Sequence, residues 1–211
     1  MTKLQFDRQA ILTIVSRLIV VLCCFPIHES AHAWAAWKLG DPTGKDSGRI
    51  SLNPLKHLDL WGTITIFLFG FGYAKPVPVD IRNFKNRKLG FALTALAGPV
   101  SNLIMAIIFI VVLKVLSQKG VGGYALILCL TYAAYINISL AVFNLIPIPP
   151  LDGSRIVTAI LPDRAYYSLL RYERYSMAVI WALLLLSSRM GVSPIASVSR
   201  SVFNFLYRLI G

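Results

Sequence analysis

A histidine–glutamate–histidine pattern, HESAH at residues 28–32, is the feature of this sequence best suited to chemistry. His28 and His32 are four residues apart, so on a helix both rings lie on one face and can bind the same metal ion. Glu29 follows the first histidine, where its carboxylate can take a proton from a zinc-bound water. The pattern also lies in a long apolar run, where ionisable residues are costly and rare unless they have a function. We therefore predict a catalytic zinc site.

A catalytic zinc ion needs a third protein ligand and an open position for water. The one other histidine, His57, lies in a polar loop. A carboxylate is the better candidate, and Asp152 follows a run of prolines in FNLIPIPPLDG, residues 143–153. Prolines end a helix, and the irregular backbone that results needs protein or water around it. The alternative is a loop aspartate at the membrane surface that binds no metal.

Helical rise places these residues at a similar depth. If residues 17–38 form one helix, His28 and His32 lie roughly 15 and 9 Å from Lys38. Asp152 lies just past the end of a later apolar run, and Gly98 lies about 11 Å inside another. We expect these separated motifs to meet near one face of the membrane.

The composition indicates a membrane protein. The chain has 211 residues, of which 56% are hydrophobic and 14% charged, and its mean hydropathy is +0.67. A soluble domain usually carries about a quarter charged residues. The excess apolar surface cannot all be buried in one small core, so lipid must cover part of it. We expect an all-α polytopic membrane protein that forms a single domain over residues 1–211, with about four to six transmembrane helices.

Apolar runs define the predicted spans. Those long enough to cross the membrane are residues 17–38, 91–113, 125–148 and 175–190. Residues 61–73 are too short, which favours a re-entrant or partly buried segment. The tail, 192–211, has apolar residues at helical spacing and could lie on the surface or complete another span. The alternating piece GRISLNP at 48–54 predicts a short strand or hairpin.

The net charge of +12 could serve either to bind nucleic acid or to fix the orientation of a membrane protein. No nucleic-acid-binding motif accompanies the charge, so we expect no nucleic acid partner. The loops 38–60, 74–90 and 149–174 hold 13 of the 21 lysines and arginines. This asymmetry favours a multi-pass protein of the plasma membrane of a prokaryote, with these loops and the active site near the cytoplasmic side.

At this point the chain resembles the site-2 protease family of intramembrane zinc metalloproteases, most of all its compact members without PDZ or CBS domains. The resemblance is carried, in this order, by HESAHAWAAWKLGD (28–41), GRISLNPLKHLD (48–59), GYAKPVPVD (72–80), AGPVSN (97–102) and FNLIPIPPLDG (143–153). It implies one zinc ion bound by His28, His32 and Asp152, with Glu29 as the general base. It also implies a small β-hairpin or sheet beside the active site.

The resemblance draws attention to two asparagines as well. Asn144 opens the last motif and Asn102 ends the Gly-Pro motif, and either could hydrogen-bond the substrate backbone or a developing oxyanion. Hydrogen bonding between helices is an equal alternative for Asn102. His57 has a counterpart in compact relatives, but we assign it no ligand role.

The predicted function is hydrolysis of peptide bonds within or near transmembrane segments of membrane-anchored protein substrates. The partners are then transmembrane proteins and the lipid bilayer. A membrane metal transporter or metal sensor with the same ligands is the alternative, but it gives no reason for Glu29 between them. A catalytically inactive scaffold is less favoured, since all four residues of the chemistry are present.

Overall fold

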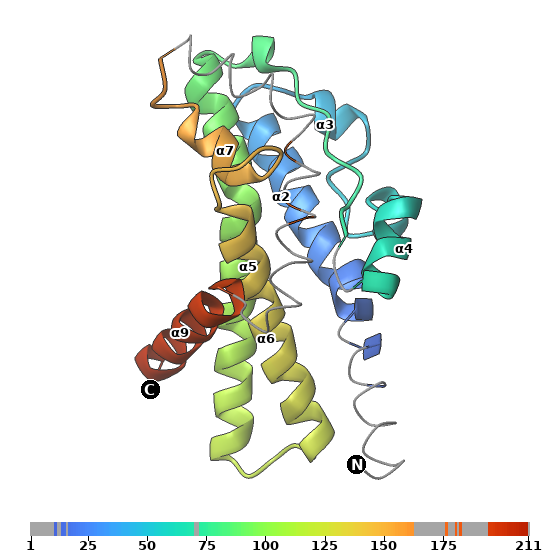
Figure 1. Ribbon diagram of the computed structural model, residues 1–211, viewed down its shortest axis with the longest axis vertical. Helices are drawn as coiled ribbons and strands as arrows, with labels where there is room; N and C mark the ends of the chain where they lie inside the picture. The colour runs from blue at the N-terminus through green and yellow to red at the C-terminus, as the bar shows by residue number, and fades with distance from the viewer. Residues whose placement is uncertain are drawn as a thin grey trace.

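The computed structural model describes residues 17–69, 72–162 and 194–210, with a few single positions outside these ranges. All regular structure in these residues is helical (Figure 1). Three of the helices, Arg17–Lys38, Arg87–Gln118 and Tyr124–Asn144, are long and apolar enough to cross a membrane. The predicted runs at 17–38, 91–113 and 125–148 thus each correspond to a helix that could span a membrane, whereas the run at 175–190 lies outside the described residues.

A helical hairpin forms the centre of the molecule. Helix α5 (Arg87–Gln118) packs along α6 (Tyr124–Asn144), and Ala106, Ile110, Ala134 and Ile138 form the buried cluster between them. Small alanines on both helices allow close approach, as in other membrane helix pairs.

The ends of α5 and α6 differ from the predicted spans for local reasons. The side chain of Asn86 accepts a hydrogen bond from the backbone of Leu89, which caps α5 four residues before the apolar run. At its other end Gly120 has a φ of 61°, and the Val121 amide bonds to the Leu116 carbonyl, as in a Schellman motif. Helix α6 ends at Asn144 rather than 148, because Pro147 cannot continue a helix.

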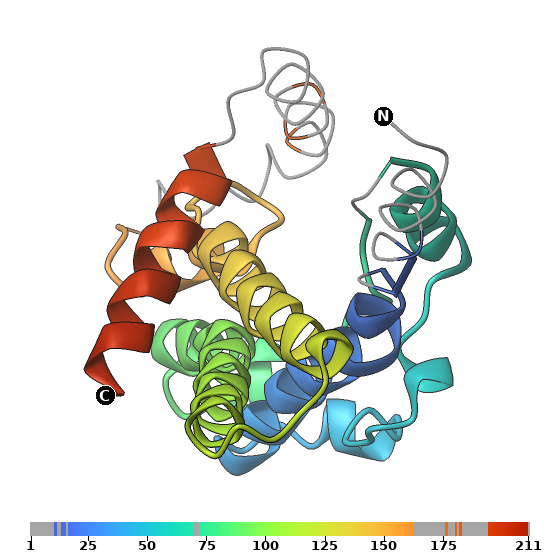
Figure 2. The ribbon, with the colours of Figure 1, turned by 90° about the horizontal axis from the view of Figure 1, so that it is seen from below.

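Within the first span, Arg17–Lys38, a π-helical turn, η1 (Val20–Cys24), continues directly into α2 (Phe25–Lys38). α2 packs against α5, and helix α9 (Pro194–Leu209) lies on the opposite side of the α5–α6 hairpin (Figure 2). The tail is thus a helix whose Val202, Phe203 and Leu206 pack on the hairpin core.

The connection 39–86 leaves α2 and reaches α5 at the same end of the molecule (Figure 1). It contains α3 (Thr43–Asp46), the short turns η2 (Pro54–Lys56) and η3 (Ile81–Asn83), and the apolar helix α4 (Leu60–Phe69). With ten residues, α4 is too short to span a bilayer. The re-entrant position of residues 61–73 stays a prediction.

The predicted β-hairpin is wrong: residues 48–54 contain no strand, and none occurs elsewhere in the described residues. The backbone groups that a strand would pair are taken by side chains instead. Ser30 of α2 accepts from the Ser51 amide at 2.8 Å and donates to the Ser51 carbonyl, which also receives His57 Nε2 at 2.7 Å. Side chains therefore replace the ladder that the alternating pattern suggested.

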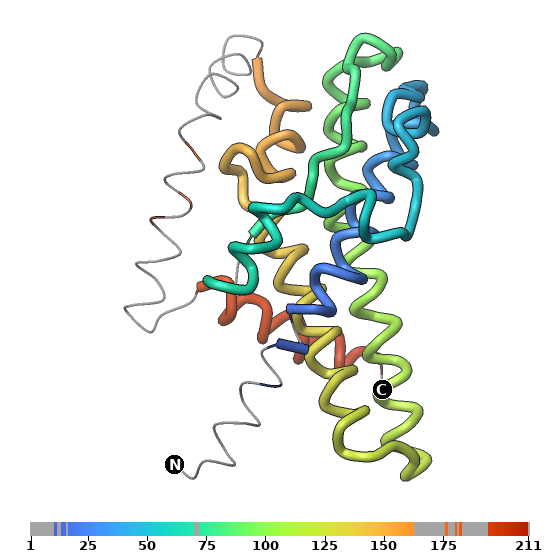
Figure 3. Tube along the Cα trace, turned by 90° about the vertical axis from the view of Figure 1, so that its right-hand side faces the viewer, coloured from blue at the N-terminus to red at the C-terminus, as the bar shows by residue number. Residues whose placement is uncertain are grey.

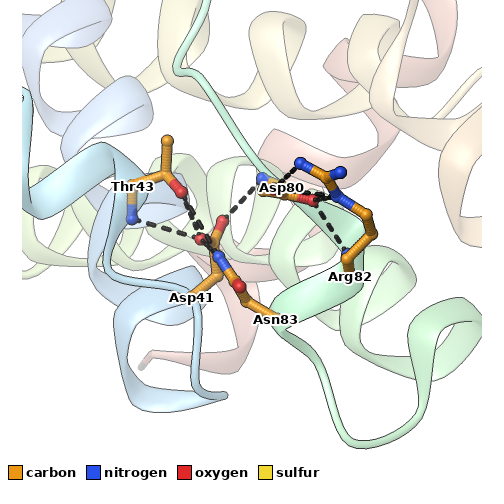
Figure 4. A network of polar contacts seen from close by, with 5 residues as sticks. All are labelled: Asp41, Thr43, Asp80, Arg82 and Asn83. Carbon is orange, nitrogen blue, oxygen red and sulfur yellow. Dashed lines mark hydrogen bonds and ion pairs between the residues drawn. The ribbon is translucent and has the colours of Figure 1, made fainter.

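The extended segment 72–80 runs from α4 toward α5 and is fixed near both ends (Figure 3). At Lys75, its backbone N–H donates to the His57 carbonyl and its carbonyl accepts from the buried Arg49 guanidinium. At Asp80, its backbone N–H donates to the fully buried Asp41 carboxylate at 2.9 Å (Figure 4). We call residues 72–80 the strap.

Candidate active site

Helix α2 presents its two histidines to one point. His28 and His32 are both buried, and their Nε2 atoms lie 3.0 Å apart. Their rings are nearly perpendicular, at 87°, so the two nitrogens converge while the rings do not stack. The spacing of four residues on one helix face produces this arrangement.

The third group arrives from α7 (Asp152–Val157), the short helix after the proline-rich turn. Asp152 Oδ2 lies 3.2 Å from His28 Nε2 and 3.3 Å from His32 Nε2. Gly153 allows this approach, because a β-carbon there would lie 2.3 Å from the Leu145 carbonyl oxygen at the end of α6. The start of α7 is thus pressed against α6, with the carboxylate directed at α2.

Helix α5 contacts the outer nitrogen of each ring. His32 Nδ1 lies 2.8 Å from the Thr94 carbonyl, and His28 Nδ1 lies 3.2 Å from Asn102 Nδ2. A bond from Nδ1–H to the Thr94 carbonyl leaves His32 Nε2 with a lone pair. This is the usual way in which proteins orient a metal-binding histidine.

These three groups fit a zinc ion. Their facing atoms are 3.0–3.3 Å apart, and ligands placed tetrahedrally at about 2.0–2.1 Å from one ion lie about 3.3–3.4 Å from each other. Asp152 Oδ2 is buried and makes no well-formed hydrogen bond despite its two close neighbours. A buried carboxylate oxygen in that condition has a strong need for a cation.

The charge state of Asp152 also suits a ligand. Burial by itself raises the pKa of its carboxyl, but the neighbouring His32 and His28 have the larger combined effect and lower the pKa below its usual value. An ionised carboxylate is the form in which an aspartate binds a metal ion.

A cavity of about 350 Å³ opens beside the three groups. Glu29, Asn102 and Asn144 all line it, together with the strap residues Gly72, Tyr73, Ala74, Pro76, Val77 and Val79. Glu29 is half-buried, on the same helix as both histidines. The structure therefore brings every residue singled out in the sequence to one cavity, except His57.

The asparagines and His57 make different contacts. Asn102 is fully buried against His28, whereas Asn144 is half-buried and its Nδ2 donates to the Leu140 carbonyl of its own helix. His57 is buried away from the cluster, bonded to Ser51; burial and the nearby Arg49 lower its pKa. It takes no part in the His–His–Asp group.

Sequence reasoning missed Thr94 and Arg49. Thr94 acts through its backbone carbonyl, which no side-chain pattern reveals, although it lies four residues before Gly98 and eight before Asn102 on the same face of α5. Arg49 looked like one more basic loop residue, yet it is buried and holds the strap.

Comparison with known proteins gives an independent view of the chain. Residues 122–187 match the model of peptidase family M50. Over 171 residues the chain is 40% identical to YwhC of Bacillus subtilis (strain 168), which carries the name "Putative zinc metalloprotease"; the match covers 79% of this chain and 78% of YwhC.

Two more distant relatives carry the same description. Rip2 of Mycolicibacterium smegmatis is 24% identical over 82% of this chain and 66% of its own length. MJ0611 of Methanocaldococcus jannaschii is 28% identical over 72% of this chain and 74% of its own length. No solved structure matches the chain significantly.

Proposed function

Since this chain belongs to peptidase family M50, the site-2 protease family of zinc metalloproteases, we propose that it cleaves membrane-anchored proteins within or next to their transmembrane segments. One observation supports this location: His28 and His32 lie inside an apolar helix, Arg17–Lys38, that is long enough to cross a membrane. Chemistry attached to such a helix acts at the depth of the bilayer rather than in a separate soluble domain.

The proposed zinc ligands are His28 Nε2, His32 Nε2 and one oxygen of Asp152. These atoms come from two elements that are far apart in the sequence, and each is buried and faces the others. Zinc, when bound, supplies a Lewis acid that polarises the scissile carbonyl and makes a water molecule acidic enough to react near neutral pH.

Glu29 is the proposed general base. It lines the same cavity as the ligands and is half-buried, so its carboxylate is reachable by water while facing protein. In this role Glu29 accepts the proton of the attacking water and delivers it to the nitrogen of the leaving amine. A metal transporter with the same ligands would have no use for such a base, and the family is one of proteases.

The substrate is proposed to bind as an extended chain. In a helix the peptide carbonyl is hydrogen-bonded and shielded by side chains, so it cannot reach the ion and the base together. The strap forms one wall of the cavity and is itself extended, and Asn144 offers amide groups to a substrate backbone on another wall. Substrate segments with helix-breaking residues should be preferred.

The active site is proposed to open toward the cytoplasm. The connections 39–86 and 145–162 lie at the end of the molecule where α2 ends and α5 begins (Figure 1). In the sequence, the segments 38–60, 74–90 and 149–174 hold 13 of the 21 lysines and arginines. Basic loops of membrane proteins remain in the cytoplasm. In a prokaryote the corresponding bilayer is the plasma membrane.

The test uses purified protein reconstituted in vesicles with a single-span substrate whose cleavage products are identified by mass spectrometry. The wild type is expected to cut within or beside the span, and a chelator should abolish the cut. Glu29→Gln should keep its zinc and lose activity by about 10²–10⁴-fold. Asp46→Asn, which removes an exposed carboxylate outside the cavity, is the matched control.

Two results would contradict the proposal. Full cleavage by Glu29→Gln would remove the base from the mechanism. Cleavage confined to soluble regions of the substrate, far from its span, would refute the intramembrane assignment.

A further inference from the structure

Asn102 is a buried amide whose position is unexplained by packing alone. It is fully buried on α5, its Nδ2 lies 3.2 Å from His28 Nδ1, and its Oδ1 has no hydrogen-bond partner. A buried carbonyl oxygen without a partner costs about 1–3 kcal/mol. Both the contact with His28 and the unpaired Oδ1 depend on which way the Asn102 amide is turned.

The direction of His28 decides which amide atom belongs there. Its Nε2 faces His32 and Asp152, so Nε2 must carry the lone pair if His28 binds a metal ion. The proton of the neutral imidazole then sits on Nδ1 and needs an acceptor. The oxygen and nitrogen of an asparagine amide are assigned only from their hydrogen bonds. Rotating the Asn102 amide by half a turn exchanges these two atoms and places Oδ1 beside His28 Nδ1.

We propose that Asn102 is the positioning residue of His28: its Oδ1 accepts the Nδ1–H of the ring, and so fixes both the tautomer and the angle at which Nε2 faces the zinc site. The half-turn exchanges the positions of Oδ1 and Nδ2, so the direction of His28 supports it rather than the number of paired atoms. This inference rests on the proposed function only in taking His28 as a zinc ligand.

A parallel contact on the same helix supports the assignment. The Thr94 carbonyl lies 2.8 Å from His32 Nδ1, and the Asn102 amide lies 3.2 Å from His28 Nδ1. Thr94, Gly98 and Asn102 follow one another at intervals of four residues, so they lie along one face of α5. Gly98, between the two acceptors, leaves room for both rings, because a β-carbon there would fall 2.5–2.6 Å from them. One face of α5 thus orients both histidines of α2.

The experiment compares zinc affinity, measured by chelator competition with purified protein and zinc alone, across matched variants. Asn102→Leu removes the acceptor at similar volume and is expected to weaken zinc binding by about 10–100-fold. Asn102→Asp keeps an acceptor and is expected to stay within about threefold of the wild type, since carboxylates serve this role in other zinc sites.

Asn137→Leu is the control for the loss of a buried helix–helix amide. Asn137 is also buried, donates to the Ala133 carbonyl and contacts Cys24, and lies outside the cavity. Its variant is expected to keep wild-type zinc affinity. Equal affinity in Asn102→Leu and the wild type, or equal loss in Asn102→Leu and Asn102→Asp, would overturn the proposal.

A spectroscopic measurement on the zinc-loaded wild type does not depend on the folding of any variant at Asn102. Long-range ¹H–¹⁵N correlation of histidine-labelled protein should show His28 protonated at Nδ1, with assignment by His28→Gln. A zinc-bound Nδ1 would overturn the proposal. If the wild type itself binds no zinc, the proposed ligand set fails; if it binds zinc and Asn102→Leu binds equally well, only the role of Asn102 fails.

Discussion

Gly98 of α5 lies directly against His32 of α2, so closely that a β-carbon at Gly98 would fall 2.5 Å from both Cε1 and Nε2 of the ring. The same β-carbon would lie 2.6 Å from His28 Cε1. Both imidazoles are held from several sides, and the whole cluster is buried, so neither can move away without losing contacts with Asp152 or α5. A glycine is therefore required at this helix crossing for space rather than for backbone conformation.

Gly98→Ala is expected to displace the imidazoles and weaken zinc binding by at least about tenfold, because a metal site tolerates only small errors in ligand position. Zinc affinity by chelator competition is the measurement. Gly123→Ala is the matched control, since a β-carbon at Gly123 would meet nothing within 4 Å and its φ of −68° suits alanine. Unaltered affinity in Gly98→Ala would show that the helices separate at little cost.

Asp152→Asn is expected to lower zinc affinity by more than about 100-fold, because it removes the charge of the proposed third ligand. The loss should exceed the loss of about 10–100-fold that follows when a residue that only orients a ligand is changed. Metal content after dialysis, determined by mass spectrometry, checks this. His57→Gln should retain its zinc, because His57 lies outside the cluster. Unchanged zinc in Asp152→Asn would point to a different third ligand.

Arg49→Met is expected to raise the KM for a membrane-anchored substrate several-fold while zinc content stays unchanged. Arg49 is buried and donates to the carbonyls of Lys56, at 2.7 Å, and Lys75, so it holds the strap that walls the cavity. Arg49→Lys should be intermediate, because a lysine cannot donate in two fixed directions as a guanidinium does. Steady-state kinetics in vesicles separate KM from kcat.

The matched control for Arg49 is Lys56→Met, which removes a neighbouring exposed charge. A loss of zinc in Arg49→Met, or a fall in kcat with KM unchanged, would contradict a role confined to the strap.

Asp41→Asn is expected to destabilise the protein at pH 7 by about 1–3 kcal/mol, because the carboxylate accepts several buried hydrogen bonds. Burial by itself raises the pKa of Asp41, but bonds from Thr43, Asn83 and the Asp80 amide prevail and lower it (Figure 4). The pKa of Asp41 is therefore lower in the folded state than in the unfolded state, where it is about 3.9. The carboxylate stabilises the fold at pH values above the unfolded-state pKa, and this stabilisation is lost as the pH falls through the folded-state pKa.

The measurement for Asp41 is thermal stability in detergent between pH 7 and pH 3. The wild type should lose more stability over this range than Asp41→Asn does. Asp46→Asn, at an exposed carboxylate, serves as the control and should follow the wild type. Parallel curves for the wild type and Asp41→Asn would contradict the assignment.

The parts of the site that the sequence predicted are those governed by regular spacing. The interval of four residues between His28 and His32 determines their common face, and apolar length locates the three spans. The end of α6 was predicted at 148 and lies at Asn144, although Pro147 alone would have indicated the earlier end. The meeting of Asp152 with both histidines followed from depth along the helices and is now seen as distances of 3.2 and 3.3 Å.

The remaining features depend on tertiary contacts that spacing does not encode. Residues 48–54 alternate like a strand, but the Ser30 hydroxyl and His57 take the backbone groups of Ser51. The contact of Asn102 with His28 depends on how α5 is rotated about its own axis. Because α5 carries apolar residues on all sides, its sequence does not determine which side faces α2. The buried position of Arg49 depends on where Lys75 lies, 26 residues later.

The order of the ligands along the chain bears on how the enzyme is made. Asp152 comes 120 residues after His32, behind the whole α5–α6 hairpin. A chain of only the first 151 residues contains both histidines and the proposed base but lacks the proposed third ligand, Asp152. The proposed metal site can therefore be completed only after the α5–α6 hairpin has been synthesised.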